Sequence, residues 1–81
     1  MSINIEDAVK ASKALGYDSA RWKEIQAGVG LSGADVDGLV GRKTVQAVYE
    51  WQVRYNAERF SSILGEDGVA GSVTCDALKG S

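Results

Sequence analysis

The sequence contains no histidine and no proline, and it has only one cysteine among its 81 residues. The absence of histidine excludes a Ser–His–Asp triad, a histidine general base and the common catalytic zinc sites with imidazole ligands. The single cysteine, Cys75, excludes an internal disulfide framework. We expect Cys75 to be a small, half-buried helix residue rather than a reactive thiol. Most hydrolytic mechanisms are therefore closed to this chain.

The sequence also lacks an excess of charge and a long apolar run. Nine basic and 11 acidic residues give a formal net charge of −2, which gives no reason to expect binding to nucleic acid or to an anionic membrane. No segment approaches the roughly 18–20 apolar residues that span a bilayer. The opening "MSINIEDAVK" has neither the positive n-region nor the apolar h-region of a secretory signal. We expect no nucleic-acid partner and no membrane partner.

Helical periodicity runs through most of the chain, whose composition of 44% apolar and 25% charged residues is typical of a globular domain. The length fits a single domain over residues 1–81. A first helix is predicted over residues 4–15, with a cap at Asn4 and a left-handed glycine, Gly16, after its end. This helix precedes the rest of the pattern and is treated as an N-terminal addition.

Three further helices are predicted. The second starts after Asp18 or Ser19, which are both good N-caps, and its buried stripe consists of Trp22, Ile25 and Val29. A glycine-rich loop, "GVGLSGADVDG", follows it. The third helix runs from near Arg42 to the high fifties, with a buried face at i, i+3, i+4, i+7 and i+11 made of Thr44, Ala47, Val48, Trp51 and Tyr55.

A short last helix is expected over residues 72–79, and it offers Val73, Ala77 and Leu78 to the core. Between the last two helices, Phe60, Ile63 and Leu64 form a further apolar group. No stretch alternates apolar and polar residues for long enough to predict a strand. The fold class expected is therefore all-α, a bundle of three helices with a short C-terminal helix and an extra N-terminal one.

One twelve-residue frame occurs twice, as "DGLVGRKTVQAV" and as "DGVAGSVTCDAL". Five positions are identical in one register, which indicates a duplicated turn-and-helix unit. Asp–Gly favours a tight turn because aspartate accepts from nearby amides and glycine adopts positive φ. We expect the next residue, Leu39 or Val69, to enter the core. The later glycines of the frame, Gly41 and Gly71, are expected to permit close backbone approach, and Thr44 and its counterpart to satisfy a backbone group.

These residues resemble the peptidoglycan-binding domain of the three-helix type over about residues 20–79. The resemblance is carried by "IQ" at residues 25–26, then D-G-x-x-G-x-x-T-x-x-A-V-x-x-W-Q, then L-G-x-D-G-x-x-G-x-x-T-x-x-A-L. The chain departs from the family in a longer segment between Gln52 and Asp67 and in the added N-terminal helix. Members of this family are non-catalytic modules of cell-wall hydrolases from bacteria and phages, and of other envelope proteins. Related domains occur in matrix metalloprotease propeptides, so the fold alone does not fix the ligand.

The resemblance implies a monomeric module without catalytic activity or cofactor that targets an attached hydrolase or envelope protein to peptidoglycan. Its place would be the bacterial envelope or periplasm, or a phage lysin acting there. Because helix N-termini and arginine favour carboxylates, the candidate ligand-binding residues are Arg42, Lys43, Tyr49, Asp37, Gln52 and Tyr55. Residues such as Arg42 and Lys43 more often form a solvated face, however, and a residue placed as Tyr55 is more often part of the core. Trp22 and Trp51 are expected to be core anchors.

Other functions are also compatible with parts of the sequence. A protein-interaction module would use the same fold, with Val53 and Phe60 as an apolar patch, and binding to insoluble cell wall separates the two hypotheses. Calcium is rejected because an EF-hand alignment puts Gly33 at the first ligand position and Thr44 at the twelfth. The second copy is worse, with Ile63 and Gly65 at the first and third. Neighbouring carboxylates suited to acid–base work occur as Asp35 with Asp37 and as Glu66 with Asp67, but such residues usually cap amides in turns.

Overall fold

The structure, a computed structural model, describes residues 4–59 and 65–80. This part of the chain forms four α-helices, one short 3-10 helix and no strand, so the all-α prediction is confirmed. The elements in order are α1 (Ile5–Ala14), α2 (Ser19–Gly28), η1 (Gly33–Asp35), α3 (Arg42–Glu58) and α4 (Ser72–Gly80). The predicted apolar group of Phe60, Ile63 and Leu64 lies outside the described residues.

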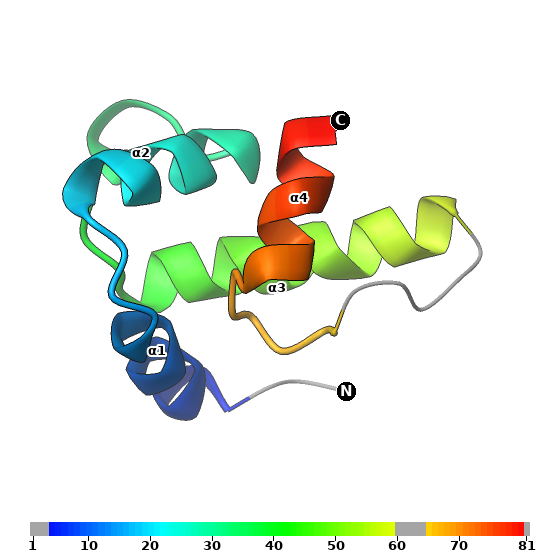
Figure 1. Cartoon of the computed structure of the whole chain (residues 1–81), viewed down its shortest axis with the longest axis horizontal. Coiled ribbons are helices and arrows are strands. Elements are labelled where there is room, and N and C mark those ends of the chain that lie inside the picture. Colours follow the sequence, from blue (N-terminus) through cyan, green and yellow to red (C-terminus); the bar gives the residue numbers. More distant parts are fainter. Residues whose placement is uncertain (1–3, 60–64, 81) are drawn as a thin grey trace.

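The 17-residue helix α3 is the longest element and runs through the length of the molecule (Figure 1). Helices α1 and α2 both contact α3, and α2 also contacts α4. In the view of Figure 1, α1 lies near the start of α3, while α2 and α4 lie on the opposite side of it. The molecule measures 32 × 25 × 21 Å. The longest helix therefore joins α1 to α2, and α4 packs against α2.

Local signals fix the first two helices where the sequence predicts them. The Asn4 side chain accepts a hydrogen bond from the Asp7 amide, and the Asp18 side chain accepts one from the Arg21 amide. Gly16 follows α1 with φ of 73°, the left-handed conformation that glycine adopts at low cost. Both caps satisfy amides that have no partner within their own helix.

The core lies between α2, α3 and α4. The predicted stripe of α2 is confirmed, since Trp22, Ile25 and Val29 are all buried. The remaining buried members of the cluster are Val48, Ala70 and Cys75. Cys75 is more enclosed than predicted, with 5% of its surface exposed.

The prediction of burial in the core is wrong for two residues. Leu39, which follows the first Asp–Gly turn, is 70% exposed, and Val73 in α4 is 55% exposed. The face of α3 is also rotated from the one predicted, because its buried residues are Thr44, Val45, Val48, Gln52 and Asn56. The aromatic residues of the predicted stripe are only half-buried. Two polar residues, Gln52 and Asn56, are thus buried in place of the neighbouring aromatic residues Trp51 and Tyr55.

A buried glutamine organises the first copy of the repeated frame. Gln26 is fully buried, and its Oε1 accepts from the Gly38 amide at 2.9 Å. Its Nε2 lies within donating distance of Asp37 Oδ1 at 3.1 Å, of the Leu39 carbonyl at 3.0 Å and of Thr44 Oγ1 at 2.9 Å. One side chain of α2 therefore fixes both the Asp–Gly turn and the first turn of α3.

The second copy repeats this arrangement around Gln52 of α3. Its Oε1 accepts from the Gly68 amide at 2.9 Å, and its Nε2 lies 3.2 Å from Asp67 Oδ1. The Val69 carbonyl and Thr74 Oγ1 lie 3.1 and 3.0 Å from the same nitrogen. Two turn-and-helix units are thus built on one plan, each held by the helix that precedes it.

The glycines of the frame have different roles from those predicted. A Cβ at Gly41 or Gly71 would meet no atom within 4 Å, so the expected close backbone approach is wrong for both. Gly38 is the crowded one, because its φ is 77° and an added Cβ would collide with Ser19 Oγ. Gly41 and Gly71 instead precede α3 and α4, where their carbonyls accept from Val45 and Cys75.

Candidate functional site

The two predicted cations at the start of α3 are exposed and paired. Arg42 Nη2 lies 3.0 Å from Glu6 Oε1, and both side chains are more than three-quarters exposed, at 76% and 77%. Lys43 Nζ lies 3.2 Å from Asp35 Oδ1. Ion pairs at this exposure contribute little to stability. Both cations therefore stay within reach of a ligand, but nothing encloses one there.

Asp37 belongs to the turn rather than to a ligand site. Its Oδ1 accepts from the Leu39 amide at 2.9 Å and from Gln26. These hydrogen bonds, first that of the Leu39 amide and then that of Gln26, hold the pKa of the Asp37 carboxyl below its usual value. The predicted Asp–Gly turn is confirmed, and Asp37 accounts for its shape.

Gln52 was predicted to contact ligand, and this prediction is wrong. Its side chain is 0% exposed, and both ends of its amide are engaged in the second turn. Spacing alone could not reveal this, because a glutamine beside an aromatic residue fits an open groove as well as a buried hydrogen-bond centre. A buried amide without such partners would be strongly unfavourable, so Gln52 is a structural residue.

The remaining predicted residues lie on different sides of α3. Tyr49 follows Arg42 by seven residues, or about two helical turns, so the two share one side. Tyr55 lies six residues after Tyr49 and is therefore about 120° away around the helix. The side between them carries the buried Gln52. The structure does not bring the six predicted residues into one groove.

Tyr55 instead forms part of a hollow on the C-terminal half of α3. Its ring lies 5.0 Å from that of Trp51, centroid to centroid, with 32° between the planes. The guanidinium carbon of Arg59 lies over the Tyr55 ring, 3.7 Å from the ring centroid. A hollow of about 240 Å³ is lined by Trp51, Arg54, Tyr55, Glu58 and Arg59. We call these five residues the aromatic shelf.

The aromatic shelf combines two chemistries. Trp51 is half-buried and packs against the core cluster, which holds the ring in place while part of it lines the hollow. Arg54 and Arg59 supply two planar guanidiniums of the kind that bind carboxylates bidentately. The helical spacings i, i+3, i+4, i+7 and i+8 from Trp51 collect all five side chains. This spacing is present in the sequence, but apolar periodicity alone places Trp51 in the core and gives no role to Arg54, Glu58 and Arg59.

The neighbouring carboxylates singled out in the sequence all have structural partners. Asp35 pairs with Lys43, and Glu66 Oε2 accepts from Asn56 Nδ2 at 3.0 Å. Asp67 Oδ1 accepts from the Val69 amide at 2.9 Å. Across residues 4–59 and 65–80, no group of three or more acidic or cysteine side chains is placed to hold a metal ion. None of the helices described is long and apolar enough to cross a membrane.

No protein-family model matches the sequence, and neither a curated protein nor a solved structure matches it significantly.

Proposed function

We propose that this chain is a non-catalytic module that binds peptidoglycan through the aromatic shelf and targets an attached hydrolase or envelope protein to the cell wall. The shelf is the observation that carries the proposal. It offers two neighbouring rings, two guanidiniums and a carboxylate along one side of the C-terminal end of α3. The motif resemblance supports the same function, and its expected place is the bacterial envelope or a phage lysin that acts there.

The chemistry of the polymer fits these groups. Peptidoglycan presents carboxylates and amides on its stem peptides and acetyl groups on its sugars. The Trp51 ring, and the part of the Tyr55 ring that Arg59 does not cover, can contact an acetyl group or an apolar side chain, and Arg54 and Arg59 can bind a carboxylate. Glu58 can accept from a ligand amide. Binding sites of this kind fix orientation with few polar groups and gain area from aromatic ones.

Co-sedimentation with purified sacculi tests the proposal. The folded wild-type protein is expected in the pellet, and Tyr55→Ala and Arg59→Ala are expected to weaken binding by about tenfold, the effect of losing one good contact. Tyr49→Ala and Arg42→Ala are matched controls, because they remove the same residue types from another side of α3. A folded wild-type protein that stays in the supernatant would contradict the function. Weakening by the two controls alone would move the site to the N-terminal half of α3.

Exposed apolar residues favour a protein-interaction module as the second candidate. Leu39 and Val73 are exposed, and Val53 is 36% exposed, while Phe60, predicted to join Val53, lies outside the described residues. Exposed leucine and valine are common singly, so this candidate gains weight only if the wild-type protein fails to sediment with sacculi. In that case, we expect Leu39→Ser to abolish binding of this chain to its protein partner without unfolding it.

A further inference from the structure

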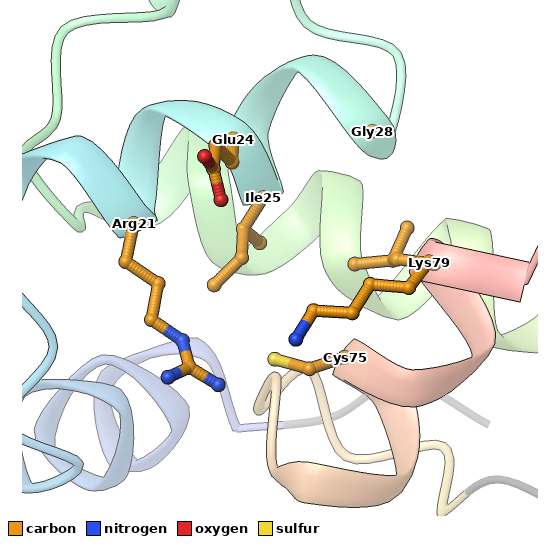
Figure 2. A pocket seen from close by; sticks show the side chains of 7 residues that line it. Arg21, Glu24, Ile25, Gly28, Cys75 and Lys79 are labelled. Atoms are coloured by element: carbon orange, nitrogen blue, oxygen red, sulfur yellow. The ribbon is translucent and has the colours of Figure 1, made fainter.

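A second hollow lies between α2 and α4, away from the aromatic shelf. Figure 2 shows this hollow from close by. Its volume is about 200 Å³. Helix α2 contributes Arg21, Glu24, Ile25 and Gly28, and α4 contributes Cys75, Leu78 and Lys79. We call this hollow the α2–α4 pocket. It shares no residue with the shelf, so nothing inferred about it depends on the proposed function.

The walls of the α2–α4 pocket are apolar. Ile25 and Cys75 are each 5% exposed and belong to the core cluster, and Leu78 packs against that cluster. Gly28 lets Leu78 pack closely against α2, because a Cβ at this position would lie only 3.1 Å from Leu78 Cδ2. A cavity of about 150 Å³ with apolar walls is known to hold benzene. The α2–α4 pocket is therefore large enough for a body about the size of one aromatic ring.

The rim of the pocket carries two cations and one anion. Arg21 and Lys79 extend from the two helices toward the region of the Cys75 sulfur (Figure 2). Among the residues described, neither cation has a carboxylate within 4.0 Å. With Glu24 as the only acidic lining residue, the rim has an excess of one positive charge. A ligand carboxylate at the rim would meet two positively charged hydrogen-bond donors, Arg21 and Lys79.

Arg21 is held in place before any ligand arrives. Its guanidinium carbon lies 4.2 Å from the centroid of the Tyr17 ring. The Tyr17 hydroxyl in turn donates to the Ala70 carbonyl at 2.9 Å, and its ring packs on that of Trp22 at 5.4 Å. A positioned guanidinium loses less conformational entropy on binding than a free one. The Tyr17 contact thus prepares Arg21 to receive an anion.

We propose that the α2–α4 pocket binds a small carboxylate with an apolar body about the size of an aromatic ring. The body lies between Ile25 and Leu78, and the carboxylate faces Arg21 and Lys79. This chemistry is shared by a free aromatic acid and by the C-terminal residue of an apolar peptide. The two ligands differ in one respect: a peptide has further residues that extend out of the pocket, and a free acid has none.

The test is a titration of the ¹⁵N-labelled protein followed by NMR, with benzoate as the probe. Benzamide and benzylamine are matched comparators that keep the ring and replace the charge. Benzoate is expected to shift the amides of Ile25, Gly28, Cys75 and Leu78 and to bind about tenfold more tightly than either comparator, the typical effect of a charge-assisted hydrogen bond. A second titration with N-acetyl-alanyl-phenylalanine distinguishes the two kinds of ligand. If this peptide binds more tightly than benzoate, the ligand is a peptide C-terminus; if it binds more weakly, the ligand is a free acid.

Matched variants test whether the charges at the pocket rim determine the affinity for benzoate. Lys79→Gln and Arg21→Gln are each expected to weaken benzoate binding by about fivefold to tenfold, and Glu24→Gln to strengthen it. Lys23→Gln changes the same charge on α2 outside the pocket lining and is expected to change binding by less than about twofold. Circular dichroism checks that each variant is folded. The proposal is overturned if benzamide or benzylamine binds as tightly as benzoate, if benzoate shifts no amide of the pocket, or if Lys23→Gln weakens binding as much as the rim variants do.

Discussion

Gln26 and Gln52 occupy equivalent places in the two turn-and-helix units. The Oε1 atom of each accepts from a turn glycine at 2.9 Å, although 12 residues separate acceptor and donor in the first unit and 16 in the second. Each Nε2 lies near an aspartate, a backbone carbonyl and a threonine hydroxyl. The duplicated frame is therefore completed by a residue that lies outside it, on the preceding helix.

A change of Gln52→Glu is expected to lower the free energy of unfolding by about 3 kcal/mol, because a carboxylate at this buried position cannot donate to the Val69 carbonyl and would lie next to the Asp67 carboxylate. Urea unfolding followed by circular dichroism measures this. Gln46→Glu is the matched control, since Gln46 is exposed on the same helix, and a change within about 0.5 kcal/mol is expected there. Equal effects of the two changes would show that Gln52 does not organise the second turn.

Gly38→Ala is expected to destabilise the protein by about 2 kcal/mol or more. Its φ of 77° is costly for alanine, and the new Cβ would collide with Ser19. Gly41→Ser is the comparison within the same frame. Gly41 has φ of −142° and caps α3 without a side chain, and serine is a good N-cap residue. Thermal unfolding is expected to show a change within about 0.5 kcal/mol for Gly41→Ser, and a larger loss there than at Gly38 would contradict the assignment of the two glycines.

Asp37 makes stability depend on pH in a predictable direction. Its pKa is lowered in the folded state from a usual value of 3.8, so the unfolded chain binds the proton more tightly. The stabilisation is fully present above pH 3.8 and is lost as the pH falls through the lower folded pKa. We expect the difference in unfolding free energy between the wild type and Asp37→Asn to shrink as the pH falls from about 5 to below 3.8. A difference that grows over this range would contradict the direction of the shift.

The sequence predicts the helices and the Asp–Gly turns because these depend on neighbouring residues. The caps at Asn4 and Asp18 and the left-handed Gly16 illustrate this, since each acts within a few residues of its own position. The glutamine centres could not be predicted in the same way. Their partners lie 12 and 16 residues away, and the unequal spacing hides Gln26 and Gln52 from a repeat of fixed register.

The candidate sites were predictable only in part, for a related physical reason. Apolar periodicity places Trp51 and Tyr55 in the core, but two buried amides, Gln52 and Asn56, rotate the inner face of α3 and leave the aromatic rings half-buried. The aromatic shelf follows from that rotation. The α2–α4 pocket depends on the packing of Leu78 beside Gly28, which no local pattern specifies.

The most direct measurement is a ¹⁵N NMR titration of the wild-type protein with soluble peptidoglycan fragments that carry their stem peptides. The largest shifts are expected at the Trp51 indole N–H and at the amides of residues 51–59, with smaller changes near Arg42 and Tyr49. Saturable shifts in that segment would support polymer binding at the aromatic shelf. Unchanged spectra at millimolar fragment, from a protein that remains folded, would contradict it.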